Sequence, residues 1–191
     1  MATLSPKVWF GKQPLRTCFK PLTGLLVTGA STGFGRSVTE LMLQKGDNVV
    51  ATLRQPSMLD DLVALYSKDR LLILPLDVTV PSDITTAFVK ARETFGSIDV
   101  VFNNAGIAII GEAEGMPDDH AKRLFDTNFW GAANVTKEAV ATFRDFNKPP
   151  GGHLLQISSR TALKAAPGAV HYAATYVLLV PSRLWFQLTY G

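Results

Sequence analysis

The sequence predicts a single α/β domain built on a doubly wound parallel sheet. Short apolar runs alternate with segments of helical periodicity from Leu25 to Tyr172, which implies right-handed crossovers between parallel strands. The runs are rich in Val, Ile and Leu, as expected of strands buried on both faces. The first run ends in a glycine-rich turn with a helical pattern directly behind it, which is typical of the Rossmann type of this fold.

The apolar runs are the expected strands, and helical patterns fill the intervals between them. Proline at a first helical position favours a helix start, as Pro81 does here, and Pro149 ends the last pattern. The strands are expected at Leu25–Thr28, Asn48–Leu53, Leu71–Leu76, Ile98–Asn103 and His153–Ser158, and the helices at Phe34–Met42, Pro81–Phe95, Asp118–Phe125 and residues 132–146.

Length and composition limit the classes of protein to which the chain can belong. A chain of 191 residues with 47% hydrophobic residues suits one folded domain, and no apolar run approaches the roughly 20 residues needed to cross a bilayer. A single cysteine, Cys18, excludes an internal disulfide framework and favours a reducing, cytoplasmic location. No metal site is expected, and no membrane partner.

The excess of basic over acidic residues does not indicate a nucleic-acid partner. The acid-free stretches 11–26 and 176–191 together carry +4, which leaves −1 for the rest of a chain whose net charge is +3. A nucleic-acid surface needs cationic groups clustered on the folded body. The acid-free N-terminus is also compatible with a mitochondrial transit peptide, but its three prolines and its lack of an amphipathic pattern disfavour that interpretation.

The glycine-rich turn has the composition of a phosphate-binding loop. Its three glycines follow the spacing Gly-x-x-x-Gly-x-Gly, which lets the backbone approach a pyrophosphate at the N-terminal end of a helix dipole. The alternative is a tight turn without a ligand. The candidate cofactor-binding residues in this segment are Thr28, Gly29, Ser31, Thr32, Gly33, Phe34 and Gly35.

Two further candidates follow the second and third strands. Arg54 comes after Leu53, at the strand end where an acidic residue would hold the ribose hydroxyls, so NADP(H) is expected in preference to NAD(H). The alternative is a solvated surface arginine. Asp77, followed by Val78, can accept a hydrogen bond from the adenine amino group; the alternative is a turn residue that bonds its own backbone.

The ends of the fourth and fifth strands carry the remaining candidates. Asn104, Ala105 and Gly106 follow the fourth strand, where small residues allow the backbone to approach a nicotinamide ribose. Ser159 follows the fifth strand, and Tyr172 lies 13 residues later. A serine hydroxyl and a tyrosine phenol can both bond one substrate oxygen, the first stabilising charge and the second passing the proton.

In order and spacing, these motifs resemble those of the short-chain dehydrogenase/reductase family over about residues 25–175. The resemblance implies an oxidoreductase that moves hydride between a nicotinamide and the carbonyl or alcohol carbon of a small molecule. It implies that Tyr172 is the general acid/base, that Ser159 orients the substrate oxygen and that Asn128 holds a water of the proton relay. Family members usually pair as homo-oligomers through two helices, one of them the helix of Tyr172.

The sequence departs from the family pattern at one catalytic position. The family has a lysine four residues after the tyrosine, where the lysine bonds the nicotinamide ribose and lowers the pKa of the tyrosine. Tyr176 stands at that position and cannot supply the charge, and the nearby Lys164 lies in the loop after the fifth strand. The resemblance therefore implies an oxidoreductase with impaired turnover, or a catalytically inactive nucleotide-binding protein.

The two ends of the chain also depart from the family. We interpret residues 1–24 as an irregular extension or insertion, 25–175 as the dinucleotide-binding domain and 176–191 as an aberrant tail, so the sheet is expected to be incomplete at its C-terminal end. One hypothesis is that residues 11–26 and 176–191 are translated introns. The alternatives are a genuine N-terminal extension with a truncated variant, or a non-functional product.

Overall fold

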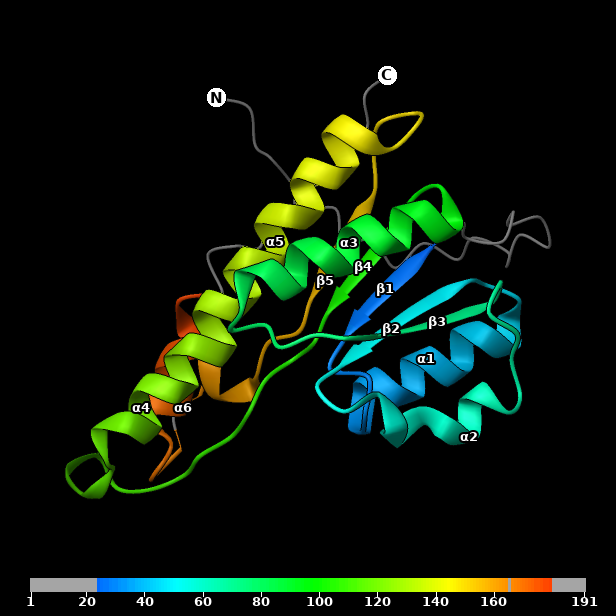
Figure 1. The fold of residues 1–191 in the computed structure, drawn as a ribbon. Coiled ribbons are helices and arrows are strands. Elements are labelled where there is room, and N and C mark those ends of the chain that lie inside the picture. Colours follow the sequence, from blue (N-terminus) through cyan, green and yellow to red (C-terminus); the bar gives the residue numbers. More distant parts are fainter. Residues whose placement is uncertain (1–23, 165, 180–191) are drawn as a thin grey trace, which may run out of the picture.

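The computed structural model describes residues 24–164 and 166–179, which form one α/β domain around a five-stranded parallel sheet (Figure 1). The strand order is β3-β2-β1-β4-β5, so β1 is central and every pairing is parallel. The predicted fold class is confirmed. The strands are β1 (Leu25–Thr28), β2 (Val49–Leu53), β3 (Leu71–Pro75), β4 (Val100–Asn103) and β5 (His153–Gln156).

Each predicted strand is present, and β1 agrees with its prediction at both ends. The last two strands are each two residues shorter than predicted, because apolar residues continue past the ladder into the connections. Ile98 is fully buried although it precedes β4, and the backbone N–H of Ile157 still donates to Asn103 O at 3.0 Å beyond the end of β5. Apolar composition therefore predicts which residues are buried, and it does not predict which of them form hydrogen bonds to a neighbouring strand.

Helices connect the strands on both faces of the sheet (Figure 1). Those that precede β4 are α1 (Gly33–Lys45), the 3-10 turn η1 (Pro56–Leu59), α2 (Asp60–Val63) and α3 (Pro81–Phe95). Those that follow it are η2 (Ala113–Gly115), α4 (Asp118–Leu124), η3 (Phe125–Gly131), α5 (Ala132–Ala141), η4 (Thr142–Phe146), η5 (Arg160–Ala162) and α6 (Val170–Val177).

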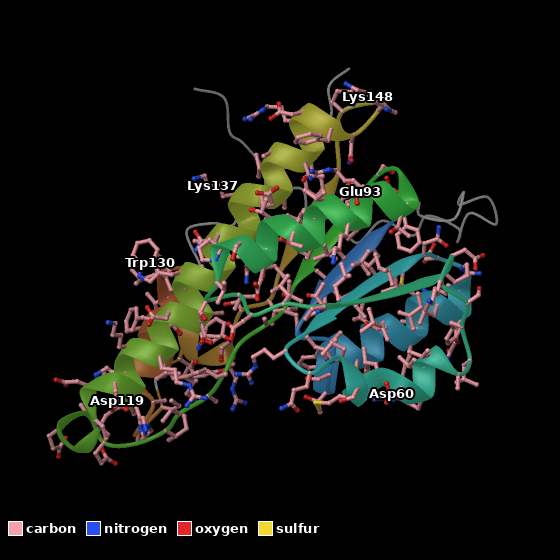
Figure 2. All side chains as sticks on the ribbon, in the orientation of Figure 1. Asp60, Glu93, Asp119, Trp130, Lys137 and Lys148 are labelled. Carbon is pink, nitrogen blue, oxygen red and sulfur yellow. The ribbon has the colours of Figure 1, made fainter. Side chains whose placement is uncertain are left out.

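The two helices predicted over 118–125 and 132–146 are one continuous helical segment. The intervening residues form the π-helical turn η3, and the backbone keeps right-handed helical angles at Leu124 and Ala132 on either side of it. Gly131 does not interrupt the helix, because it packs directly on Val78. Trp130 projects from the outer side of this segment and is 57% exposed (Figure 2).

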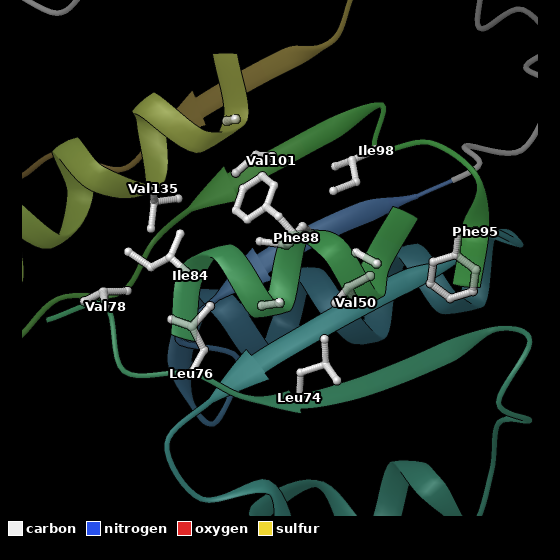
Figure 3. Packing of buried hydrophobic residues seen from close by; sticks show 14 of the residues in the cluster. Val50, Leu74, Leu76, Val78, Ile84, Phe88, Phe95, Ile98, Val101 and Val135 are labelled. Atoms are coloured by element: carbon white, nitrogen blue, oxygen red, sulfur yellow. The ribbon is translucent and has the colours of Figure 1, made fainter. Parts of the chain in front are cut away.

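The core lies in two layers, one on each face of the sheet. On one face α3 and α5 pack against the central strands, with Phe88, Ile84 and Val135 buried together (Figure 3). On the other face Leu43 of α1 and Leu62 of α2 pack against the opposite sides of the same strands. The two layers leave the carboxyl ends of the strands uncovered, and this is the edge where such folds bind ligands.

Several sequence expectations fall outside the described residues, namely those on residues 1–23 and 180–191. Tyr176 and Val177, placed in the tail by the sequence interpretation, are the last residues of α6. Among the residues that the structure describes, no helix combines the length and the apolar character that a bilayer crossing requires.

Candidate cofactor and active site

The glycine-rich turn between β1 and α1 has the backbone shape that its sequence predicted. Gly29 and Gly33 adopt φ angles of 68° and 55°, which L side chains rarely adopt. A Cβ on Gly35 would lie 2.2 Å from Gly29 O, so only glycine fits there. The turn leads directly into the N-terminus of α1, whose first turn has no acidic side chain. The positive end of the helix dipole therefore faces the open edge of the sheet.

Thr28 connects the glycine turn to the end of β4. Its Oγ1 accepts hydrogen bonds from the backbone N–H groups of Asn104 and Ala105, at 2.9 and 3.0 Å. The side-chain amide of Asn104 donates back to Thr28 O at 2.9 Å and to Gly29 O at 3.3 Å. The residue is fully buried, so Thr28 fixes the wall of the site from behind and does not line it. The amides that follow β4 thus tie the end of β4 to the end of β1.

A pocket of about 450 Å³ lies at the carboxyl edge of the sheet, beside the glycine turn. This volume falls in the range of small-molecule and cofactor sites. Of the predicted cofactor-binding residues, ten line it: Gly29, Ser31, Thr32, Phe34, Arg54, Asp77, Val78, Asn104, Ala105 and Gly106. The six other lining residues are Leu53, Leu76, Thr79, Ile107, Arg123 and Thr127.

Asp77 is a turn residue, which is one of the two interpretations that its sequence allowed. Its Oδ1 accepts hydrogen bonds from the backbone N–H and the hydroxyl of Thr79, at 2.9 and 2.8 Å, which makes it a turn residue. The same side chain lines the pocket. Arg54, exposed and also in the lining, follows directly on the buried Leu53. The pocket wall at β2 therefore offers a guanidinium and no carboxylate at the position where ribose hydroxyls are usually held.

Asn128 connects three segments around the end of β4. Its Oδ1 accepts from Ile107 N at 2.8 Å, and its Nδ2 donates to Ile107 O at 2.9 Å and to Thr175 Oγ1 at 3.3 Å. The residue lies within the π-helical turn η3, a feature that often marks functional sites. Because Ile107 lines the pocket and Thr175 belongs to α6, one side chain positions both the pocket wall and the helix of Tyr172.

The structure brings the segment of Ser159 and the helix of Tyr172 together but does not pair their hydroxyls. Turn η5, which Ser159 precedes, packs against α6. The Ser159 Oγ accepts hydrogen bonds from the backbone N–H and the hydroxyl of Thr161, at 3.2 and 2.8 Å. It therefore caps η5 in this structure, and these two contacts leave the hydroxyl hydrogen of Ser159 for a substrate oxygen to accept.

Tyr176 stands one helical turn after Tyr172 on the same side of α6, as the sequence predicted. It is 7% exposed, and the two rings meet edge to face with centroids 5.1 Å apart. A Cβ on Gly106 would lie 2.7 Å from the Tyr176 hydroxyl, so the phenol reaches the backbone of the pocket wall. Burial raises the pKa of Tyr176 above its ordinary value of 10.0, and the neighbouring Tyr172 adds to the rise.

Comparison with known protein families identifies one match. The sequence model of the family described as short chain dehydrogenase matches residues 24–177. The chain is 40% identical to an uncharacterized oxidoreductase of Schizosaccharomyces pombe, over 79% of this chain and 49% of that protein. It is 38% identical to the oxidoreductase calM of Penicillium decumbens, over 78% of this chain and 50% of that protein. The chain thus spans about half the length of these curated relatives.

Solved structures share the fold. A short-chain dehydrogenase from Streptomyces avermitilis superimposes with a TM-score of 0.78 at 33% identity, covering 86% of this chain and 59% of that one. A serine dehydrogenase complexed with NADP+ superimposes with a TM-score of 0.77 at 28% identity, covering 83% of this chain and 63% of that one.

Proposed function

This chain belongs to the short chain dehydrogenase family, and from that premise we propose that it binds NADP(H) in preference to NAD(H). We propose further that the whole protein is an oxidoreductase of carbonyl or alcohol groups on a small molecule, and that turnover is impaired in this chain. The observation that carries the nucleotide proposal is the pocket at the carboxyl edge, lined by both the glycine turn and Arg54.

The residues of the pocket fit a dinucleotide. The left-handed φ angles of Gly29 and Gly33 shape the turn at the N-terminus of α1, where backbone N–H groups and the helix dipole favour a pyrophosphate. Arg54 offers an exposed guanidinium for a 2′-phosphate, since guanidinium groups bind phosphate strongly. Asp77 also lines the pocket, and its carboxylate would accept a hydrogen bond from the adenine amino group. A related serine dehydrogenase was solved with NADP+, which agrees with this assignment.

The catalytic assignment follows the family pattern. When bound, the nicotinamide supplies or accepts the hydride. Tyr172 would pass the proton to the substrate oxygen, and Ser159 would orient that oxygen by donating its O–H, while its Oγ still accepts from Thr161. Asn128 would position the pocket wall through Ile107 and the helix of Tyr172 through Thr175, and would hold a water of the proton relay.

A second candidate function is a nucleotide-binding protein without catalysis, and Tyr176 is the observation that favours it. A neutral, buried phenol beside Tyr172 cannot lower the pKa of Tyr172 as a cation would. General acid/base assistance contributes about 10²–10⁴-fold to rates. The two functions differ in turnover and share the nucleotide site.

Further proposals concern the surroundings of the protein. The family and the single cysteine favour the cytoplasm, with a small-molecule substrate and without a nucleic-acid or membrane partner. We also propose that the whole protein forms homo-oligomers of the family type. The chain spans about half the length of its curated relatives.

The proposal is tested by titrating the full chain with NADPH and with NADH, following the fluorescence of the nicotinamide. We expect tighter binding of NADPH, and we expect Arg54→Ala to remove most of that preference by weakening NADPH about 10-fold while leaving NADH unchanged. Arg144→Ala is the control, because Arg144 is exposed and pairs with Asp145 outside the pocket. Equal affinities in the native chain would overturn the NADP(H) preference, and no binding of either would overturn the nucleotide site.

A further inference from the structure

Arg123 lines the pocket from an element to which the proposed function gives no role. The phosphate turn, Arg54 and Asp77 come from the ends of β1, β2 and β3, whereas Arg123 belongs to α4 in the second half of the chain. The structure includes every acidic residue of the chain, and none of them forms an ion pair with Arg123. Arg36, Arg92 and Arg144, by contrast, each pair with a carboxylate.

The position of α4 over the pocket follows from the packing of the continuous helix. Gly131 rests on Val78, because a Cβ there would lie 2.7 Å from Val78 Cγ2. Thr127 and Arg123 lie four and eight residues earlier in the same helix, and both line the pocket. From the contact of Gly131 with the loop after β3, the helix extends back toward its N-terminus and places Arg123 about 12 Å along its axis, at 1.5 Å per residue, in the outer wall.

The pocket that Arg123 lines offers a place for a purine as well as for phosphates. The pocket wall after β2 and β3 is apolar, formed by Leu53, Leu76 and Val78, with Asp77 beside it to accept from an amino group. Phosphate groups have their own partners at the glycine turn and at Arg54. A guanidinium is planar and weakly hydrated, so it stacks on aromatic rings as well as pairing with anions.

We propose that Arg123 binds the adenine ring of the dinucleotide, with its guanidinium plane stacked on the face opposite the apolar wall. The inference rests on the proposed function, because it assigns the adenosine end of the same pocket. Arg123 then contributes to the affinity for NADPH and NADH alike, whereas Arg54 distinguishes between them. A lysine at this position would keep the charge and lose the plane.

The test is a set of titrations on Arg123→Gln and Arg123→Lys, with NADPH and NADH as probes. Lys122→Gln is the matched control, because Lys122 is an exposed cation on the same helix outside the pocket lining. We expect both Arg123 variants to weaken both nucleotides by the same factor, about 3- to 10-fold, and Lys122→Gln to leave both affinities unchanged.

Three results would overturn the inference. Full affinity in Arg123→Lys would show that charge alone is needed, and a loss confined to NADPH would place the contact at the 2′-phosphate. Unchanged affinities in Arg123→Gln would remove the contact altogether. Failure of the native chain to bind either nucleotide is a separate outcome, because it overturns the proposed function before any variant is compared.

Discussion

The rings of Tyr172 and Tyr176 meet edge to face on one side of α6, with their centroids 5.1 Å apart and their planes at 67°. The second ring belongs to a small buried cluster with Ala132 and Leu179, and its hydroxyl reaches the backbone at Gly106. The arrangement places a neutral, buried group beside the proposed acid. Catalytic assistance from this position would need a cation that the chain does not have there.

Replacing Tyr176 with lysine is expected to restore assistance to Tyr172. A cation one helical turn away lowers the pKa of the Tyr172 phenol, so carbonyl reduction by NADPH should rise by about 10²-fold or more. The measurement is NADPH oxidation over a panel of aldehydes and ketones, across pH. Tyr176→Phe is the control and should bring no gain. A Tyr176→Lys variant that binds NADPH and turns over no faster than the native chain contradicts the role given to this position.

Tyr176 should also make the fold sensitive to alkali. Burial raises its pKa above 10.0 in the folded state, so the folded protein holds the proton more tightly than the unfolded chain does. This contribution to stability is fully present below the unfolded pKa, and it is lost as pH rises from about 10 towards the folded pKa. Urea unfolding at pH 8 and above pH 10 measures it. Tyr176→Phe should show a smaller alkaline loss, and an equal loss in both proteins would contradict the assignment.

Thr28→Val should destabilise the domain through the two amides that it leaves without an acceptor. The substitution keeps the shape and removes the oxygen that accepts from Asn104 N and Ala105 N, which costs about 1–3 kcal/mol. Thr39→Val is the matched control, because Thr39 is equally buried but its hydroxyl only donates to Gly35 O of its own helix. Urea denaturation compares them. Equal losses in the two variants would show that the Thr28 contacts carry no special weight.

Gly35→Ala should abolish nucleotide binding while the domain remains folded. The added methyl would lie 2.2 Å from Gly29 O and 2.7 Å from Asn104 Nδ2, so the phosphate turn must move away from β4. We expect the affinity for NADPH to fall by more than about 10-fold, because the turn backbone sets the phosphate geometry. Gly115→Ala, with open space around the new methyl, is the control. Native affinity in Gly35→Ala would exclude the turn as the phosphate site.

The sequence predicts the sheet and the cofactor side of the site well, because both depend on local patterns. Buried parallel strands are apolar along their whole length, and the glycine spacing encodes backbone angles that only glycine adopts readily. Gly29, Arg54 and Gly106 therefore line the pocket as their positions in the pattern suggested.

Arg123 and Thr127 were missed because their role depends on packing. Tertiary contacts, among them that of Gly131 with Val78, decide where the helix crosses the strand ends. Arg123 and Thr127 are four residues apart, and both precede Asn128. This spacing was the available signal, but it places two side chains on one face of a helix and does not indicate what that face covers. The continuous helix was missed for a related reason. Asp126, Thr127 and Asn128 are poor helix formers, and tertiary contacts override that preference.

The central place of β1 in the sheet has a consequence for the order of folding. Along the chain, one crossover separates β1 from its partner β2. Two strands and their helices lie between β1 and its other partner, β4. Closing the longer loop costs more chain entropy, so we expect the β1–β2–β3 unit to assemble first and the β1–β4 pairing to complete late. The nucleotide pocket spans that late junction. Thr28→Val should accordingly accelerate unfolding and leave the refolding rate nearly unchanged, and a slowed refolding rate would reverse this order.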